Sequence, residues 1–243
     1  MAKFGRFTGR TSNLLDQAIK NPPSFHLNRL CVYQDWINGK YFLDQSEYIK
    51  ATDVDVSRVI GHEQGYGEMS WLEMLHGLKR IESNLKELAR NPTYYLSCEE
   101  KPHWSFVEVD DKIFISSGKH RTTVLRYLAH YNPEHFKTGP IAQGVQLFRR
   151  HLDYETMDLV NAINQRIEAF PHLSFRYIGG HMGERRWQLS NQSQNSVWNL
   201  TRGQIEELSH DLSETSFIKR LIGRGYQACF RESMWTGLGP NLD

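Results

Sequence analysis

The segment from residue 113 to residue 128 constrains the fold of this chain more than any other. Residues 113–115, Ile-Phe-Ile, are typical of a short buried strand, and Ser-Gly-Lys-His-Arg at 117–121 follows as a tight turn. Three apolar residues then recur at the spacing of one helix face: Val124, Leu125 and Leu128. The pattern predicts a strand, a glycine turn and the start of an amphipathic helix.

A turn of this kind is suited to hold a phosphate group. Gly118 lets the backbone turn sharply and lets an anion approach it. The first N–H groups of a helix have no partner within the helix, and the helix dipole adds partial positive charge there. Lys119 and Arg121 add full charges, and His120 is a candidate proton carrier. Hydroxyl contacts are expected from Ser117 and Thr122. The alternative is a chance helix cap with two solvated cations.

The other segments predict a mixed α/β (α+β) fold. One helix is expected at 70–90, where Ser70 and Glu73 form a capping box and leucines recur at helical spacing; another is expected at 154–170. Strands are expected at 31–33, 41–43, 106–109, 113–115 and 145–149. A hairpin of 173–177 with 186–189, a loop at 190–196 and two short helices follow, the first with a second capping box, Thr201 and Gln204.

Three parts are expected along the chain: a basic N-terminal arm at 1–24, a core domain at 25–170 and a C-terminal extension at 171–243. The arm ends at Asn21-Pro22-Pro23 and is interpreted as solvated, with phosphate contact as the alternative. The formal net charge of +1 excludes a global attraction to polyanions, so nucleic-acid binding requires a local basic face. Scattered cysteines and the lack of a long apolar run predict a cytoplasmic protein without a membrane segment.

The segment at 113–125, Ile-Phe-Ile-Ser-Ser-Gly-Lys-His-Arg-Thr-Thr-Val-Leu, resembles the signature of the ParB/sulfiredoxin superfamily. In that family a strand ends in a small residue and Gly-x-His-Arg or Gly-x-Arg-Arg, and an amphipathic helix follows. Val-Gln-Leu-Phe at 145–148 and the acidic turn and helix at 152–166 resemble the family's next elements. The resemblance covers about residues 50–170 and implies a small mixed sheet with helices.

The same resemblance implies that the turn Gly118-Lys119-His120-Arg121 binds nucleotide or nucleic-acid phosphates. The implied cofactor is ATP or CTP with Mg²⁺. Lys119 stands where sulfiredoxins have their reactive cysteine, so sulfinic acid reductase activity is not expected.

Two further segments bear on chemistry. Gly-His-Glu-Gln-Gly-Tyr-Gly at 61–67 is a glycine-rich loop that in relatives of this fold faces the phosphate turn. It offers Glu63 as a general base or metal ligand and His62 as a proton carrier, with a plain flexible connector as the alternative. No His-Glu-x-x-His or comparable metal pattern occurs, so no resident metal site is assigned and a metal would have to be recruited with bound phosphates.

The C-terminal part offers candidate DNA contacts. Residues 200–208 and 213–222 resemble a helix-turn-helix, in which Lys219, Arg220 and Arg224 would contact DNA; a helical hairpin packed on the core is the alternative. Gly-Glu-Arg-Arg-Trp at 183–187 copies the ParB partition motif, yet no helical pattern follows it. It is expected to be a structural hairpin in which Arg185 and Arg186 add basic surface.

The leading hypothesis is therefore a ParB-like, DNA-associated protein of a bacterium, phage or mobile element, with nuclease or nucleotide-hydrolysing activity left open. The catalytic candidates are His120, Glu63 and Arg121. The alternatives are a nucleotide-dependent small-molecule kinase, similar to free serine kinases, and a binding module without catalysis. DNA and a nucleotide are the expected partners, with a homodimer left open.

Overall fold

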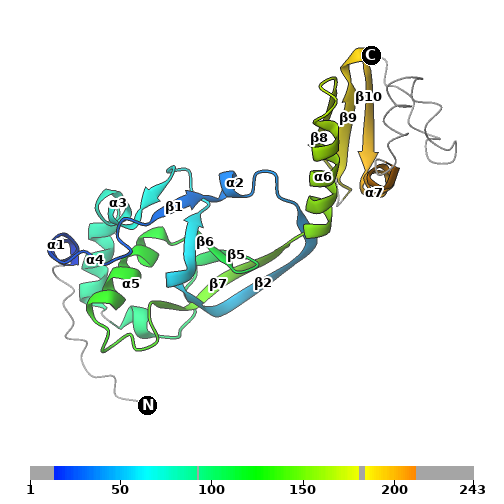
Figure 1. Cartoon of the computed structure of the whole chain (residues 1–243). Coiled ribbons are helices and arrows are strands. Elements are labelled where there is room, and N and C mark those ends of the chain that lie inside the picture. The colour runs from blue at the N-terminus through cyan, green and yellow to red at the C-terminus, as the bar shows by residue number, and fades with distance from the viewer. Residues whose placement is uncertain (1–13, 92, 181–183, 212–243) are drawn as a thin grey trace. The chain divides into compact units, whose positions relative to one another are not determined.

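The computed structural model describes residues 14–91, 93–180 and 184–211 of the chain (Figure 1). They belong to two compact units, Met1–Leu152 and Asp153–Asp243. The mixed α/β class is confirmed: one unit has a mixed seven-stranded sheet and the other an antiparallel three-stranded sheet.

The sheet of the first unit has the strand order β2-β7-β5-β6-β3-β1-β4. Its strands are β1 (Arg29–Val32), β2 (Phe42–Asp55), β3 (Val59–His62), β4 (Met69–Ser70), β5 (Ser105–Val109), β6 (Lys112–Ser117) and β7 (Ile141–Leu152). β5 and β6, which contain the strands predicted at 106–109 and 113–115, pair as an antiparallel hairpin. β3 and β6 are parallel, so their carboxyl ends lie at the same edge of the sheet.

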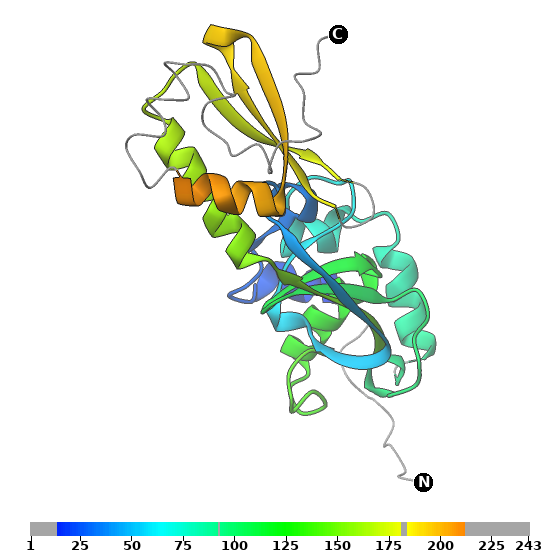
Figure 2. The same cartoon turned by 90° about the vertical axis from the view of Figure 1, so that its right-hand side faces the viewer.

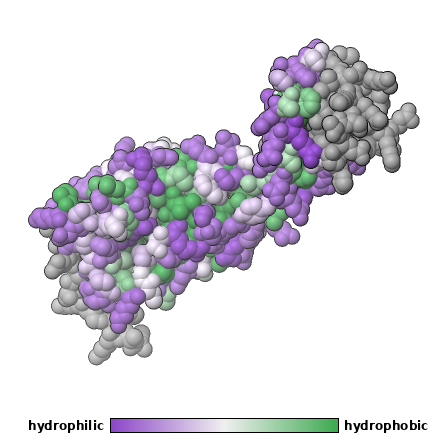
Figure 3. All heavy atoms as spheres, viewed as in Figure 1, coloured by the Kyte–Doolittle hydropathy of each residue, from purple (hydrophilic) through white to green (hydrophobic). Residues whose placement is uncertain are grey.

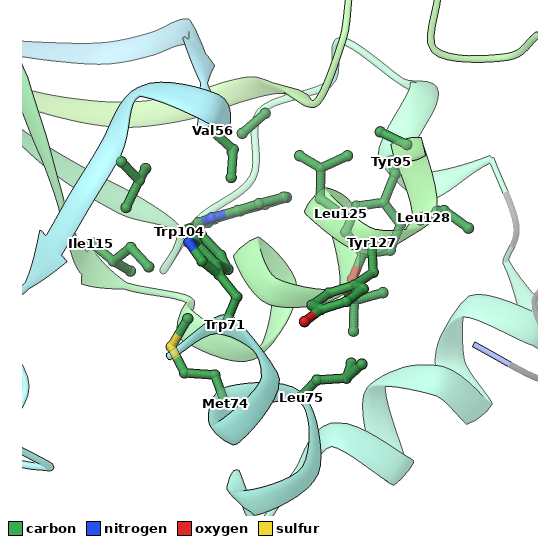
Figure 4. Close-up of a cluster of buried hydrophobic side chains, with 14 of the residues drawn as sticks. Val56, Trp71, Met74, Leu75, Tyr95, Trp104, Ile115, Leu125, Tyr127 and Leu128 are labelled. Carbon is green, nitrogen blue, oxygen red and sulfur yellow. The ribbon is translucent and has the colours of Figure 1, made fainter. Parts of the chain in front are cut away.

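Helices cover one face of this sheet. They are α1 (Leu14–Lys20), α3 (Trp71–Gly77), α4 (Ile81–Arg90) and α5 (Lys119–Tyr131), with the 3₁₀ turns η1 (Val56–Arg58) and η2 (Tyr94–Leu96). Figure 4 shows the core between helices and sheet, where Trp104 lies among Trp71, Ile115 and Leu125. The opposite face carries a smaller apolar cluster around Tyr33 of α2 (Tyr33–Trp36) and Phe114. In the view of Figure 3, hydrophobic side chains gather over the middle of this unit among mostly hydrophilic ones.

β1 pairs with β3 and β4, and β2 pairs with β7. Two sequence predictions are corrected in this unit. The helix expected at 70–90 is two helices, because Leu78 turns into the core with an extended backbone directly after Gly77. Residues 14–20, expected to be part of a solvated arm, form α1, whose Leu14 is buried.

The second unit consists of α6 (Tyr154–Ile167), the strands β8 (Leu173–Gly179), β9 (Arg186–Asn191) and β10 (Ser196–Thr201), the 3₁₀ turn η3 (Gln192–Gln194), and α7 (Arg202–Asp211). α7 packs against α6, as Figure 2 shows. The predicted β8–β9 hairpin is confirmed. The loop expected at 190–196 is shorter, because β9 continues to Asn191 and the strand β10, whose Trp198 and Leu200 are buried, begins at Ser196.

The boundary between the units lies at residue 153, earlier than the predicted boundary at 170. The reason is Asp153, which caps α6 by accepting a 3.0 Å hydrogen bond from the backbone N–H of Thr156. Its carboxylate also pairs with Arg185 at 2.5 Å and with Arg202 at 3.6 Å. Helix α6 is therefore tied to the sheet that follows it.

Candidate functional site

The site lies where the parallel strands β3 and β6 end and α5 begins. Gly118 joins β6 to α5 with a φ of +81°, a conformation that side chains disfavour. A Cβ atom at this position would lie 2.5 Å from Cδ1 of Trp104. Only glycine fits, so the predicted role of Gly118 as the turning residue has a structural cause.

The two hydroxyls predicted to contact phosphate already have partners inside the protein. Oγ of Ser117 donates to the carbonyl of His103 at 2.8 Å and lies 2.9 Å from Oγ of Ser105. Oγ1 of Thr122 accepts a 2.9 Å hydrogen bond from Nε1 of Trp104 and donates to the carbonyl of Gly118 at 3.1 Å. Both hydroxyls hold the turn in place.

Lys119 is buried although it is the first residue of α5. The residue is 1 % exposed, and its Nζ has no hydrogen-bond partner within the described part of the chain. The ring of Tyr66 lies over Nζ, with its centroid 3.9 Å away. Burial lowers the pKa of Lys119 from 10.5 to about 8.

His62, the last residue of β3, lies at the same edge. It is fully buried, and neither ring nitrogen has a hydrogen bond of good geometry to a described residue, although the carbonyls of Gln64 and Gly67 lie nearby. Burial and then the charge of Lys119 lower the pKa of His62. The glycine-rich loop is fastened over this edge, because Nε2 of Gln64 donates to the carbonyl of Ser116 at 3.1 Å. The structure thus brings the loop and the phosphate turn together.

Arg121 points to a different side of the helix start from Lys119. It donates to the hydroxyl of Tyr94 at 3.0 Å and to the carbonyls of Pro102 and His103, and it lies over the ring of Trp104. All these partners are neutral, so none of them pairs with the guanidinium as a counter-ion.

Arg121 also lines a cavity of about 370 Å³. The other lining residues come from α4, its C-cap and η2: Asn84, Glu87, Leu88, Asn91, Tyr94 and Tyr95. None of these was a sequence candidate. The only signal in the sequence was a group of Asn and Tyr residues between 84 and 95, before the Gly118 turn. Their spacing matches no recognised motif. The carboxylate of Glu87 is paired with Arg90 at 2.7 Å. The cation, side-chain amides and aromatic rings that remain suit a ligand with a planar ring and a negative group.

The other two catalytic candidates are not brought together. His120 is half-buried, and its pKa is lowered by burial and by the charges of Arg80, Lys119 and Arg121. The carboxylate of Glu63 instead acts electrostatically on Tyr33. Burial raises the pKa of Tyr33, and the negative charge of Glu63 also raises it. The structure gives no contact between Glu63 and His120 among the residues it describes.

The DNA-contact candidates are placed only in part. Lys219, Arg220 and Arg224 lie outside the described residues, as does the second helix of the expected helix-turn-helix. Its first helix is α7, where Gln204 accepts from the backbone N–H of Thr201. Arg185 and Arg186 pair with Asp153 and Glu184, which neutralises much of the basic surface expected there.

No group of three or more His, Cys, Asp or Glu side chains in residues 14–91, 93–180 and 184–211 is placed to hold a metal ion. In the same ranges no helix has the length and apolar character needed to cross a membrane.

The chain was compared with known proteins. No protein-family model, curated protein or solved structure matches it. The resemblance to the ParB/sulfiredoxin superfamily therefore stays a prediction that rests on the residues of the turn.

Proposed function

We propose that this chain binds a nucleotide, or a nucleotide unit of DNA, at the start of α5. The observation that carries the proposal is Arg121, a positively charged residue of the predicted phosphate turn, in the wall of a cavity of about 370 Å³. Its described partners are neutral oxygens and a tryptophan ring, so its charge has no counter-ion among them. A phosphate group would supply that counter-ion.

The walls of the cavity fit the rest of such a ligand. The ring of Tyr94 stacks on Trp104 with an interplanar angle of 8°, which makes a rigid aromatic surface for a base. Nδ2 of Asn84 donates to the carbonyl of Arg80, and Oδ1 of Asn91 accepts from Oγ1 of Thr93. The amide oxygen of Asn84 and the amide nitrogen of Asn91 are then the groups that suit the edge of a base or ribose. Mg²⁺ would be held mainly by the phosphates, since it is commonly bound through substrate phosphates and few protein groups.

The experiment is thermal unfolding of the full chain with ATP, ADP, CTP or GTP and Mg²⁺. A nucleotide at about 100 times its dissociation constant should add about 2.7 kcal/mol to the free energy of unfolding. Arg121→Ala should lose this gain. Arg176→Ala is the matched control, because it removes an exposed arginine of the other unit. No gain for any nucleotide in the wild-type chain would contradict the proposal.

The DNA part of the proposal has its own test. Phosphate contacts weaken steeply as salt rises, so filter binding of duplex and single-stranded DNA should give an affinity that falls between 50 mM and 200 mM salt. Nucleotide binding without any salt-sensitive DNA affinity would remove DNA as the partner.

A small-molecule phosphotransferase is the second candidate function. It is favoured by the size of the cavity, which suits one mononucleotide rather than a duplex, and by the net charge of only +1. Release of ADP from ATP that increases on adding a small hydroxyl compound such as serine would support it. Release that increases on adding DNA would favour the first function.

A further inference from the structure

Two lysines of the first unit, Lys101 and Lys119, are buried, and they differ in the hydrogen-bond acceptors around Nζ. Lys101 is 3 % exposed, but its Nζ donates to the carbonyls of Ser97, Glu99 and Gln143. Three acceptors satisfy its three donors, so Lys101 is a structural cation. Lys119 is 1 % exposed and has no acceptor in the described residues. The ring of Tyr66 over Nζ offers a cation–π contact but no hydrogen bond, so burying the ammonium group there still costs free energy and favours the neutral amine.

We infer that Lys119 is a nucleophilic amine that forms an imine with the carbonyl carbon of a small aldehyde or keto acid. The geometry behind this inference is a buried Nζ without acceptors among the described residues, a buried imidazole at the same edge of the sheet and one exposed ring over Nζ. The inference does not depend on nucleotide binding, because Arg121 and its cavity lie on another side of the helix start.

The neutral amine is the reactive form. A pKa of about 8 in place of 10.5 raises the neutral fraction at pH 7 by about 300-fold. An exposed lysine such as Lys50, whose side chain is 71 % exposed, has no comparable burial. Lys119 should therefore react faster than exposed lysines near neutral pH once a carbonyl compound reaches it.

His62 is the group placed to move protons in this step. It is buried at the end of β3, and the charge of Lys119 acts on it. Its ring nitrogens lack hydrogen bonds of good geometry to described residues, so they are available to accept and return a proton. The charge that acts on His62 is that of Lys119, whereas His120 is acted on by Arg80, Lys119 and Arg121.

Access to Nζ is controlled by Tyr66. Its ring covers Nζ, yet the residue is 57 % exposed and lies between Gly65 and Gly67. A Cβ on either glycine would meet nothing within 4 Å, so the surroundings do not confine this loop tip. Rotation of one exposed side chain would uncover the amine.

The start of α5 also suggests the class of carbonyl compound. The N-terminal end of this 13-residue helix favours negative charge, so a carbonyl compound that carries a carboxylate should be preferred over a neutral one. In the reaction the Nζ lone pair attacks the carbonyl carbon and gives a carbinolamine. The carbinolamine then loses its oxygen as water, taking both amine protons, and a C=N bond remains. The step needs no oxidant or reductant.

The test is reductive trapping in the full chain. Glyoxylate and cyanoborohydride at pH 7 convert an imine into a stable carboxymethyl-lysine, which peptide mapping assigns to a residue. Lys119 should be modified at least about tenfold faster than Lys50. Acetaldehyde, the neutral comparison, should react more slowly at Lys119.

Four variants sharpen the result. Lys119→Met should abolish the fast modification, and His62→Gln should slow it. Tyr66→Ala should accelerate it by uncovering Nζ, whereas Tyr66→Phe, which keeps the ring, should not. The inference is overturned if Lys119 is modified no faster than Lys50 in both the wild type and Tyr66→Ala.

Discussion

The indole N–H of Trp104 donates a 2.9 Å hydrogen bond to the hydroxyl of Thr122, one turn into α5. The same hydroxyl donates back to the carbonyl of Gly118, and the indole ring lies where a Cβ of Gly118 would be. Trp104 is fully buried, so one side chain fixes both the turn and the first turn of the helix. The geometry of the candidate site therefore depends on a residue that comes before β5 in the chain.

Gly118→Ala should destabilise the first unit strongly. The new Cβ would lie 2.5 Å from the Trp104 ring, and φ at this position is +81°. Backbone strain and the clash together should cost about 2 kcal/mol or more. Urea unfolding measures the loss. Gly65→Ala is the control, because its Cβ meets nothing within 4 Å; an equal loss in both variants would show that the Trp104 contact is not the cause.

Thr122→Val should destabilise the chain by about 1–3 kcal/mol, because the buried N–H of Trp104 loses its acceptor without a change in side-chain shape. Thr122→Ser keeps the hydroxyl and should lose less. Both can be compared by urea unfolding followed by tryptophan fluorescence. If Thr122→Ser has the lower free energy of unfolding of the two variants, the methyl group of Thr122 contributes more to stability than its hydrogen bond with Trp104.

The second unit should lose stability in acid through Asp153. Burial alone would raise the pKa of Asp153, but hydrogen bonds from Thr156 and Arg185 and the charge of Arg202 outweigh it and hold that pKa below its ordinary value of 3.8. The stabilisation is therefore complete above about pH 4 and is lost as pH falls through the lowered pKa.

Asp153→Asn should cost about 3 kcal/mol at pH 7, because it leaves the guanidinium of the half-buried Arg185 without its anion. The difference from the wild type should shrink below pH 4, where the wild-type carboxylate takes up its proton. Guanidinium unfolding of the full chain at pH 7 and pH 3 measures it. A constant difference at the two pH values would show that the charge of Asp153 contributes nothing.

The parts of the fold that the sequence predicted are those set by local pattern. Gly118 with its flanking apolar residues predicted β6, the turn and α5, and all three are present. Ser70 and Glu73 predicted a reciprocal cap, which the structure contains with hydrogen bonds of 3.1 Å and 2.6 Å. Residues a few positions apart are enough to fix such features.

The environment of the two cations could not be predicted in this way. Lys119 and Arg121 are two positions apart, and about 100° of rotation per residue sends their side chains to different sides of the helix. What each one meets comes from distant segments: Tyr66 lies in the loop after β3, and Tyr94 lies in η2. The sequence therefore identified the residues of the turn but not the burial of Lys119 or the cavity at Arg121.

Long-range packing also explains the remaining differences. Leu78 follows the helical period, but it enters the core with an extended backbone and ends α3. Trp198 and Leu200 alternate with half-buried or exposed residues, as expected for a strand. The polar residues at 190–196 before them predicted a loop, so this strand was not predicted. In both places tertiary contacts outweigh local propensity.

The stability of the first unit should rise with pH above 8 because of Lys119. Burial lowers the pKa of Lys119 from 10.5 to about 8, so between these values the unfolded chain binds more protons than the folded one. Lys119→Met, which removes the buried charge and keeps the length of the side chain, should be more stable than the wild type at pH 7. Its advantage should decline between pH 8 and pH 10.5, by at most about 3 kcal/mol. Urea unfolding of both proteins across this range measures the change, and other titrating groups cancel in the difference.

Lys101→Met is the contrasting variant: it should be less stable than the wild type at pH 7, because it leaves three carbonyls without their donor. If the Lys119→Met advantage does not change with pH, Lys119 keeps its proton in both states, and the lowered pKa is wrong.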